Sequence, residues 1–221
     1  MSSCFSRCLR VPIAIRAFYE SYLWILQTLL LTHPDLHPAL LGVQIETLTK
    51  AVTYGLPEWA LPDGTYDDLH RFAVTQRDLF KKVQPVVGAA AALRRLDASH
   101  QVRIRIITHR LFIKYTHQIA VQQTTEWLDN YGIPYWDLCF MKEKDKVGAS
   151  LYIEDSPSNI KALREANKQV IIFTNSTNVG EKGLRANTWE EVENLVFKEL
   201  EKWKLEKTQK QADGPHQTSG V

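Results

Sequence analysis

Cysteine is scarce in this sequence, and charge of one sign does not dominate it. Three thiols, at positions 4, 8 and 139, are too few for a disulfide framework, so we expect a reducing compartment. Cys4 and Cys8 lack a second ligand pair at the spacing of a zinc site, and we interpret them as free thiols. The formal net charge of +2 gives no reason to predict binding to nucleic acid or to an anionic membrane surface.

The N-terminus has no apolar run long enough to cross a membrane. The run from Tyr22 to Leu31 is shorter than the roughly 20 residues that a membrane-spanning helix needs. No acidic residue precedes Glu20, whereas Arg7 and Arg10 and several serines do, which is a composition typical of a mitochondrial transit peptide. We favour the other interpretation, an amphipathic helix packed on the protein. A cytoplasmic location is therefore predicted, with a mitochondrial one as the alternative.

The first third of the chain has helical and turn-rich patterns and no convincing strand. Helices are predicted from Ile13 to about Thr32, where His33-Pro34 ends the pattern, from 44 to 52, and from 67 to 83. We therefore interpret residues 1–84 as an N-terminal segment of helices and loops, which precedes the core.

After Pro85 strands alternate with helices, which indicates a parallel sheet covered on both faces. Strands are predicted at 102–107, 138–141, 151–153 and 169–173, and helices at 86–96, 116–131, 157–167 and 188–203. Thr188 with Glu191 three residues later forms a capping-box pattern for the last helix. The α/β core is thus expected to span 85–203, and the polar residues 204–221 to form a disordered tail.

Two places after the predicted strands suggest phosphate binding, because open parallel sheets bind ligands where their strands end. Thr108 follows the strand 102–107, and its hydroxyl beside backbone N–H groups can hold a phosphate oxygen, or simply cap the turn. The run Lys142-Glu143-Lys144-Asp145-Lys146 offers an ammonium that could neutralise a phosphate, although lysine runs are usually solvated surfaces.

A third place carries two adjacent carboxylates, Glu154 and Asp155, after the strand 151–153. Such a pair at the end of a buried strand is costly unless a cation joins it, and Mg²⁺ suits all-oxygen ligands. A competing interpretation is that Asp155 or Ser156 caps a helix whose first residue is Pro157. Because capping does not explain Glu154, a Mg²⁺ site is also expected here.

Taken together and in order, these three places resemble motifs two, three and four of the haloacid dehalogenase superfamily. Lys144 precedes Glu154 by ten residues and is the better match to the family's lysine, with Lys146 as the fallback. The stretches RIRIITHRLF, TTEWLDNYGIPYWDLCFMK, VGASLYIEDSPSNIKAL and IIFTNSTN resemble the 5′(3′)-deoxyribonucleotidase-like branch. YGLPEW and DDLHRFAVTQRDLF resemble its helical cap, so the resemblance covers roughly residues 50–195.

The resemblance implies a three-layer Rossmann-like core with a parallel sheet and a small helical cap. It also implies hydrolysis of a phosphomonoester, a nucleoside monophosphate or another small phosphate, by an attacking aspartate, Mg²⁺ and a second aspartate acting as the acid. Whether the chain forms a homodimer stays open. Each matched residue takes a role from the family: Thr108 holds phosphoryl oxygens, Lys144 offsets their charge, Asp155 with Glu154 holds the metal, and His109 and Arg110 contact the substrate.

The family's first motif, a hydrophobic strand ending in Asp-x-Asp-Gly, is missing. The first aspartate is Asp35, and Leu61-Pro62-Asp63-Gly64 imitates only the end of the motif, within the cap. The first core strand is therefore expected to be missing or replaced, unless Val11 to Ile15 fills its place, which Pro12 disfavours. Without the carboxylates, catalysis should be impaired. The alternative is a non-catalytic module that binds nucleotide or a protein partner.

Overall fold

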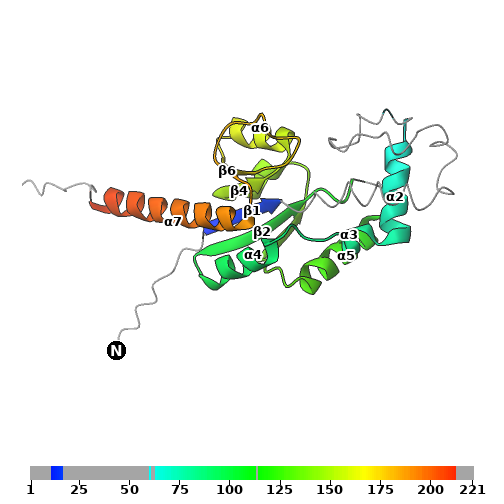
Figure 1. The fold of residues 1–221 in the computed structure, drawn as a ribbon, viewed down its shortest axis with the longest axis horizontal. Helices are drawn as coiled ribbons and strands as arrows, with labels where there is room; N and C mark the ends of the chain where they lie inside the picture. The colour runs from blue at the N-terminus through cyan, green and yellow to red at the C-terminus, as the bar shows by residue number, and fades with distance from the viewer. Residues whose placement is uncertain (1–10, 17–59, 61–62, 113, 213–221) are drawn as a thin grey trace, which may run out of the picture.

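Six parallel strands form one sheet, in the order β3-β2-β1-β4-β5-β6, in the part of the chain that the structure describes (Figure 1). This structure is a computed structural model, and it describes residues 11–16, 60, 63–112 and 114–212. The strands are β1 (Val11–Arg16), β2 (Val102–Thr108), β3 (Asp137–Phe140), β4 (Leu151–Glu154), β5 (Gln169–Phe173) and β6 (Arg185–Ala186). The helices are α2 (Thr65–Arg77), α3 (Leu79–Lys82), α4 (Ala89–Ala98), α5 (His117–Asn130), the 3₁₀ helix η4 (Lys144–Val147), α6 (Pro157–Glu165) and α7 (Trp189–Ala212).

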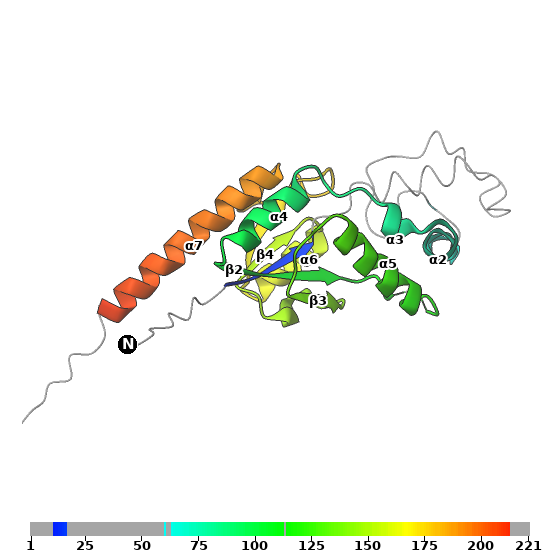
Figure 2. The ribbon, with the colours of Figure 1, turned by 90° about the horizontal axis from the view of Figure 1, so that it is seen from below.

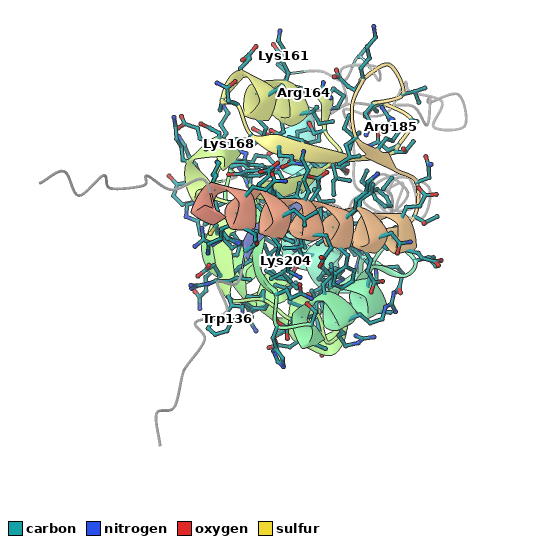
Figure 3. The ribbon with its side chains drawn as sticks, turned by 90° about the vertical axis from the view of Figure 1, so that its left-hand side faces the viewer. Trp136, Lys161, Arg164, Lys168, Arg185 and Lys204 are labelled. Carbon is teal, nitrogen blue, oxygen red and sulfur yellow. The ribbon has the colours of Figure 1, made fainter. Side chains whose placement is uncertain are left out.

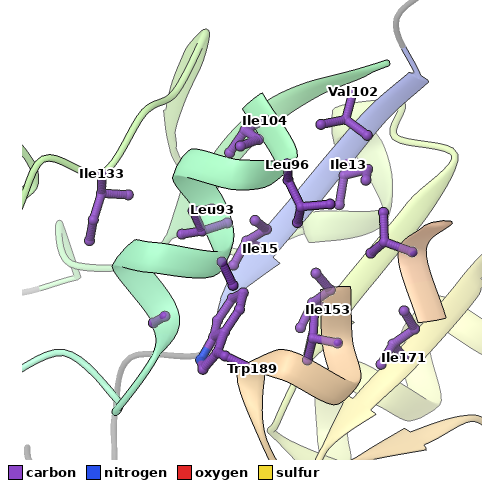
Figure 4. Packing of buried hydrophobic residues seen from close by; sticks show 14 of the residues in the cluster. Ile13, Ile15, Leu93, Leu96, Val102, Ile104, Ile133, Ile153, Ile171 and Trp189 are labelled. Carbon is purple, nitrogen blue, oxygen red and sulfur yellow. The ribbon is translucent and has the colours of Figure 1, made fainter. Parts of the chain in front are cut away.

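Helices cover both faces of the sheet, which confirms the predicted α/β fold with three layers. Leu93 and Leu96 of α4 and Trp189 of α7 pack on one face, over Ile13 and Ile15 of the central strand (Figure 4). The other face packs against α6, through side chains that include Ile160 and Leu163. No helix among the described residues is both long enough and apolar enough to cross a membrane.

The central place in the sheet is occupied by β1, so the expectation of a helix beginning at Ile13 is wrong, and the first core strand is present. Ile13 and Ile15 face one apolar cluster and Ala14 the other. Such burial on both faces is typical of a central parallel strand. Pro12 is tolerated near the start of the strand because only its missing N–H is lost, while its carbonyl accepts a hydrogen bond from Ser150 N at 2.9 Å. The rest of that predicted helix, and the one at 44–52, lie outside the described residues.

The cap helix predicted from 67 to 83 is two helices, α2 and α3, separated by Asp78. Asp78 has a φ of 52°, a left-handed conformation that aspartate tolerates better than most residues. The helical periodicity of the sequence was therefore correct, but it did not show this break.

The last helix, α7, continues to Ala212, so the prediction of disorder is wrong for residues 204–212. Figure 2 shows its C-terminal part extending beyond the sheet. The sequence contains no glycine or proline from the start of α7 until Gly214. Ion pairs one turn apart, such as Lys204 Nζ to Glu201 Oε1 at 2.6 Å, also support this polar helix. The predicted cap at Thr188 is confirmed, since its Oγ1 accepts a hydrogen bond from Glu191 N at 3.2 Å.

Candidate active site

The C-terminal ends of β1, β2 and β4 lie at one edge of the sheet, because the three neighbouring strands are parallel. Thr108 is the last residue of β2, and Glu154 is the last of β4. Between them β1 ends at Arg16, which pairs in register with Glu154. Thr108 and the acidic pair are thus brought to the same edge, with one strand between them.

Lys144 and Glu154 form a buried ion pair at this edge. The Lys144 Nζ lies 3.0 Å from Glu154 Oε2, and the two side chains are only 4% and 2% exposed. Lys146, by contrast, pairs with Asp145, and its side chain is 65% exposed. Because removal of two charges from water requires close pairing, Lys144 and Glu154 depend on each other. Of the two candidate lysines, Lys144 is therefore the one at the site, and its catalytic role stays a prediction.

The second carboxylate oxygen of Glu154 organises the turn that follows β4. Oε1 accepts hydrogen bonds from the backbone N of Asp155 at 3.2 Å, from the backbone N of Ser156 at 3.1 Å and from Asn159 Nδ2 at 3.2 Å. Both oxygens of Glu154 are thus engaged within the protein. This arrangement suits a residue that orients Lys144 and the turn, in support of Asp155, better than a direct metal ligand.

Asp155 is held through its backbone by two asparagines of the loop after β5. Its carbonyl accepts hydrogen bonds from Asn178 Nδ2 at 2.7 Å and from Asn175 Nδ2 at 3.2 Å. Both asparagines lie in the stretch IIFTNSTN, which resembles the family, but neither was predicted to belong to the site. The signal that could have found them is two amides just after a buried strand, at the same edge as the acidic pair.

The described residues contain no group of three or more histidine, cysteine, aspartate or glutamate side chains that could hold a metal ion. Mg²⁺, however, is commonly bound in proteins by one or two carboxylates together with water and the phosphates of a substrate. The buried carboxylate of Asp155 fits that requirement as one ligand. We therefore expect any binding of Mg²⁺ here to depend on phosphate.

Arg110 attaches the loop after Thr108 to the cap and to α5. Its NH1 donates a hydrogen bond to Thr124 Oγ1 at 2.9 Å, and its guanidinium carbon lies 4.3 Å from the centre of the Phe80 ring in α3. The side chain is buried. This placement supports a structural role for Arg110, and its predicted contact with substrate, like that of His109, stays a prediction.

A buried histidine of α2, His70, lies against the aromatic rings of Phe80 and Phe112. The His70 ring lies 4.8 Å from the Phe112 ring and 5.6 Å from the Phe80 ring. Burial, and then the charge of Arg110, lower the pKa of His70 to about 3. His70 is therefore neutral at physiological pH.

A single glutamine of α5 satisfies backbone groups on both sides of the cap's break at Asp78. Gln123 Oε1 accepts a hydrogen bond from Phe80 N at 3.2 Å, and its Nε2 donates one to Val74 O at 2.8 Å. Close by, Trp127 Nε1 donates to Val83 O at 2.5 Å. The cap helices α2 and α3 are thus tied to the same core helix that receives Arg110.

The parallel sheet with its helical cap, and the threonine, lysine and acidic pair at one edge, define an α/β protein of the haloacid dehalogenase type. Residues 44–201 match the model of the family described as 5′ nucleotidase, deoxy (pyrimidine), cytosolic type C protein. The chain belongs to this family, which confirms the resemblance inferred from its motifs.

A relative from Chlorobaculum tepidum, whose name assigns it to the 5′(3′)-deoxyribonucleotidases, is 53% identical over 153 residues. The match covers 69% of this chain and 75% of the relative. Among solved structures, the chain is similar to a haloacid dehalogenase superfamily hydrolase from Geobacter sulfurreducens, with 13% identity, a TM-score of 0.49 and coverage of 84% of this chain and 98% of the other. A hydrolase from Streptococcus pneumoniae gives 14% identity and a TM-score of 0.40, with coverage of 75% and 92%.

Proposed function

We propose that this chain binds the phosphate of a nucleoside monophosphate at the edge where β2 and β4 end, and that its hydrolytic activity is impaired. The observation that carries the proposal is the buried Lys144–Glu154 ion pair next to Asp155, one strand away from Thr108. These residues supply a hydroxyl, a positive charge and a carboxylate, which is what a phosphate with a divalent cation requires.

Each residue has a distinct task in this proposal. The Thr108 hydroxyl donates a hydrogen bond to a phosphoryl oxygen, and the Lys144 ammonium, oriented by Glu154, offsets the charge of the phosphate. Asp155 would hold Mg²⁺, which supplies charge neutralisation at the phosphoryl group when it is bound. Membership of a nucleotidase family supports a nucleoside monophosphate as the ligand.

The impairment is inferred from the last residue of the central strand and the two residues after it. In register with Glu154, β1 has Arg16, and the sequence continues with Ala17 and Phe18. None of the three has a carboxylate that could attack phosphorus or protonate the leaving oxygen. Binding without turnover follows, and this also favours the second candidate function, a non-catalytic module that binds nucleotide.

Calorimetric titration with 2′-deoxyuridine 5′-monophosphate and Mg²⁺, combined with an assay of phosphate release, tests the proposal. We expect micromolar binding without turnover by the unmodified chain. Thr108→Val should weaken nucleotide binding, and Asp155→Asn should remove its dependence on Mg²⁺. Asp129→Asn, on the exposed surface of α5, is the control and should change neither. Absence of binding would refute the site, and Mg²⁺-dependent phosphate release abolished by Asp155→Asn would refute the impairment.

The remaining expectations stay predictions. The cytoplasmic location, its mitochondrial alternative and the homodimer rest on sequence alone, as does the absence of nucleic acid and membrane partners. The division into segments 1–84, 85–203 and 204–221 needs two amendments, because β1 lies within the core sheet and α7 continues to Ala212.

A further inference from the structure

Asn178 is the most deeply buried of the polar side chains that the structure describes, with an exposure of 0%. Its Nδ2 donates hydrogen bonds to Asp155 O at 2.7 Å and to Phe173 O at 2.8 Å. Its Oδ1 accepts from Arg185 NH1 at 2.9 Å and from Asn175 N at 3.1 Å. Every hydrogen-bonding atom of this amide is therefore used, and the bonds join the ends of β4, β5 and β6.

Arg185 of β6, which is labelled in Figure 3, holds Asn178 from a second direction. Its NH2 donates to the backbone carbonyl of Asn178 at 2.9 Å and also to that of Glu181. A planar guanidinium with several donors in fixed geometry is well suited to fix a loop in this way. A continuous series of hydrogen bonds thus runs from Arg185 through Asn178 to the backbone of Asp155.

We propose that Asn178 is a positioning residue for the cation site, and that it acts through Asp155 while Arg185 fixes Asn178 in turn. The inference rests on the proposed function, in which Asp155 is a carboxylate ligand. A hydrogen bond at the Asp155 carbonyl fixes the backbone from which that carboxylate projects, so the ligand is oriented before a cation arrives. Outer hydrogen bonds of this kind orient metal ligands and raise metal affinity.

The competing explanation is that Asn178 merely packs the loop after β5. Arg164 provides a matched comparison, because it holds the same loop from α6 through hydrogen bonds to Glu181 and Lys182. Its NH1 donates to Glu181 Oε2 at 2.8 Å, and its NH2 donates to Lys182 O. Loss of Arg164 should loosen the loop and leave the bonds at Asp155 in place.

The test measures binding of Mn²⁺ to the full chain, by the electron paramagnetic resonance signal of the free ion, in the presence of inorganic phosphate. We expect Asn178→Leu, which keeps the size of the side chain and loses all its hydrogen bonds, to weaken Mn²⁺ binding by about 10- to 100-fold. Arg185→Gln, which retains Asn178, should weaken Mn²⁺ binding by a smaller factor. This variant tests the proposal if Asn178→Leu does not fold. Arg164→Gln should lower the melting temperature while it leaves the Kd for Mn²⁺ unchanged.

The possible failures are distinguishable. If the unmodified chain does not bind Mn²⁺ with phosphate, the proposed function fails, and the role of Asn178 fails with it. If the unmodified chain binds and the Asn178 and Arg185 variants bind equally well, only the positioning role is refuted. Equal weakening by Arg164→Gln would also refute it, because loop packing alone would then explain the effect.

Discussion

The ammonium of Lys144 lies 3.0 Å from a carboxylate oxygen of Glu154, and both groups are almost entirely shielded from water. The two residues come from η4 and from the end of β4. Their bond therefore attaches η4 to the edge of the sheet, and it keeps the Lys144 ammonium at the proposed phosphate site. The same bond makes the fold depend on a pair of charges.

Removal of one member of this pair should destabilise the protein strongly. Lys144→Met leaves the buried carboxylate of Glu154 unpaired, and Glu154→Gln leaves the buried ammonium of Lys144 unpaired. Removal of one partner of a buried ion pair typically lowers the free energy of unfolding by about 3–5 kcal/mol. The double variant should cost less than the sum of the two single changes, because no charge is then left alone. Urea unfolding of the four proteins measures this coupling.

A more accessible pair in the same segment provides the control for that cycle. Lys146 Nζ lies 3.2 Å from Asp145 Oδ2, and the two side chains are 65% and 20% exposed, so the corresponding changes there should alter the free energy of unfolding by less than about 1 kcal/mol. Additive effects at Lys144 and Glu154 would contradict the coupling that their geometry implies.

The buried His70 should make the stability depend on pH. Its pKa is lowered from 6.5 to about 3 in the folded chain, so the unfolded chain takes up the proton first as the pH falls. The stability from the neutral side chain is thus present above pH 6.5 and is lost as the pH falls from 6.5 towards 3. A full shift of this kind changes the free energy of unfolding by up to about 1.4 kcal/mol per pH unit.

The variant His70→Gln tests this dependence. Its free energy of unfolding is measured at pH 7 and at pH 4.5, both within about two units of the unperturbed histidine pKa, and is compared with that of the unmodified chain. The variant should lose less stability than the unmodified chain over that interval. His117→Gln, at the exposed start of α5, should follow the unmodified chain. Parallel pH profiles for all three proteins would show that His70 does not contribute.

Gln123 should determine how firmly the cap is held on the core. Gln123→Leu leaves Val74 O and Phe80 N without their bonds to this side chain, and an unsatisfied buried polar group costs about 1–3 kcal/mol. Hydrogen exchange should therefore accelerate in α2 and α3, with little change in the sheet. Gln122→Leu is the matched control, because the exposed Gln122 amide donates a hydrogen bond to Glu126 Oε1 on the same helix and to neither cap residue named here. Equal exchange rates in the two variants would show that Gln123 does not hold the cap.

The sequence predicted those parts of the fold whose signals are local. The strand at 169–173 was predicted with its observed ends, because it is a buried, β-branched run between polar residues. The central strand β1 was considered at Val11 to Ile15 but disfavoured, because its partners lie at positions 102–106 and 151–154, far away in the chain, and because Pro12 weakens the local pattern. Tertiary pairing here overrides local preference.

The residues of the candidate site likewise divide into those that the sequence predicted and those that it did not. Thr108, Lys144 and Asp155 were selected by residue type and spacing, which suffice for side chains that follow strands. Asn178 was missed because its hydrogen bond to Asp155 joins residues 23 positions apart, and the local signal, two amides just after a buried strand, does not indicate which residue they bind. The choice of Lys144 over Lys146 likewise became firm only with the ion pair to Glu154.

The chain offers a direct way to test why hydrolysis should be impaired. Since Arg16 pairs in register with Glu154 at the end of the central strand, Arg16→Asp combined with Phe18→Asp creates an Asp-x-Asp sequence there. If the missing carboxylates are the obstacle, phosphate release from 2′-deoxyuridine 5′-monophosphate with Mg²⁺ should rise at least about 100-fold, the lower range for one positioned acid–base group. Arg16→Asn with Phe18→Asn has nearly the same shape without the nucleophile and should show no gain. A folded Asp-x-Asp variant as inactive as this control would mean that the chain lacks more than the two carboxylates.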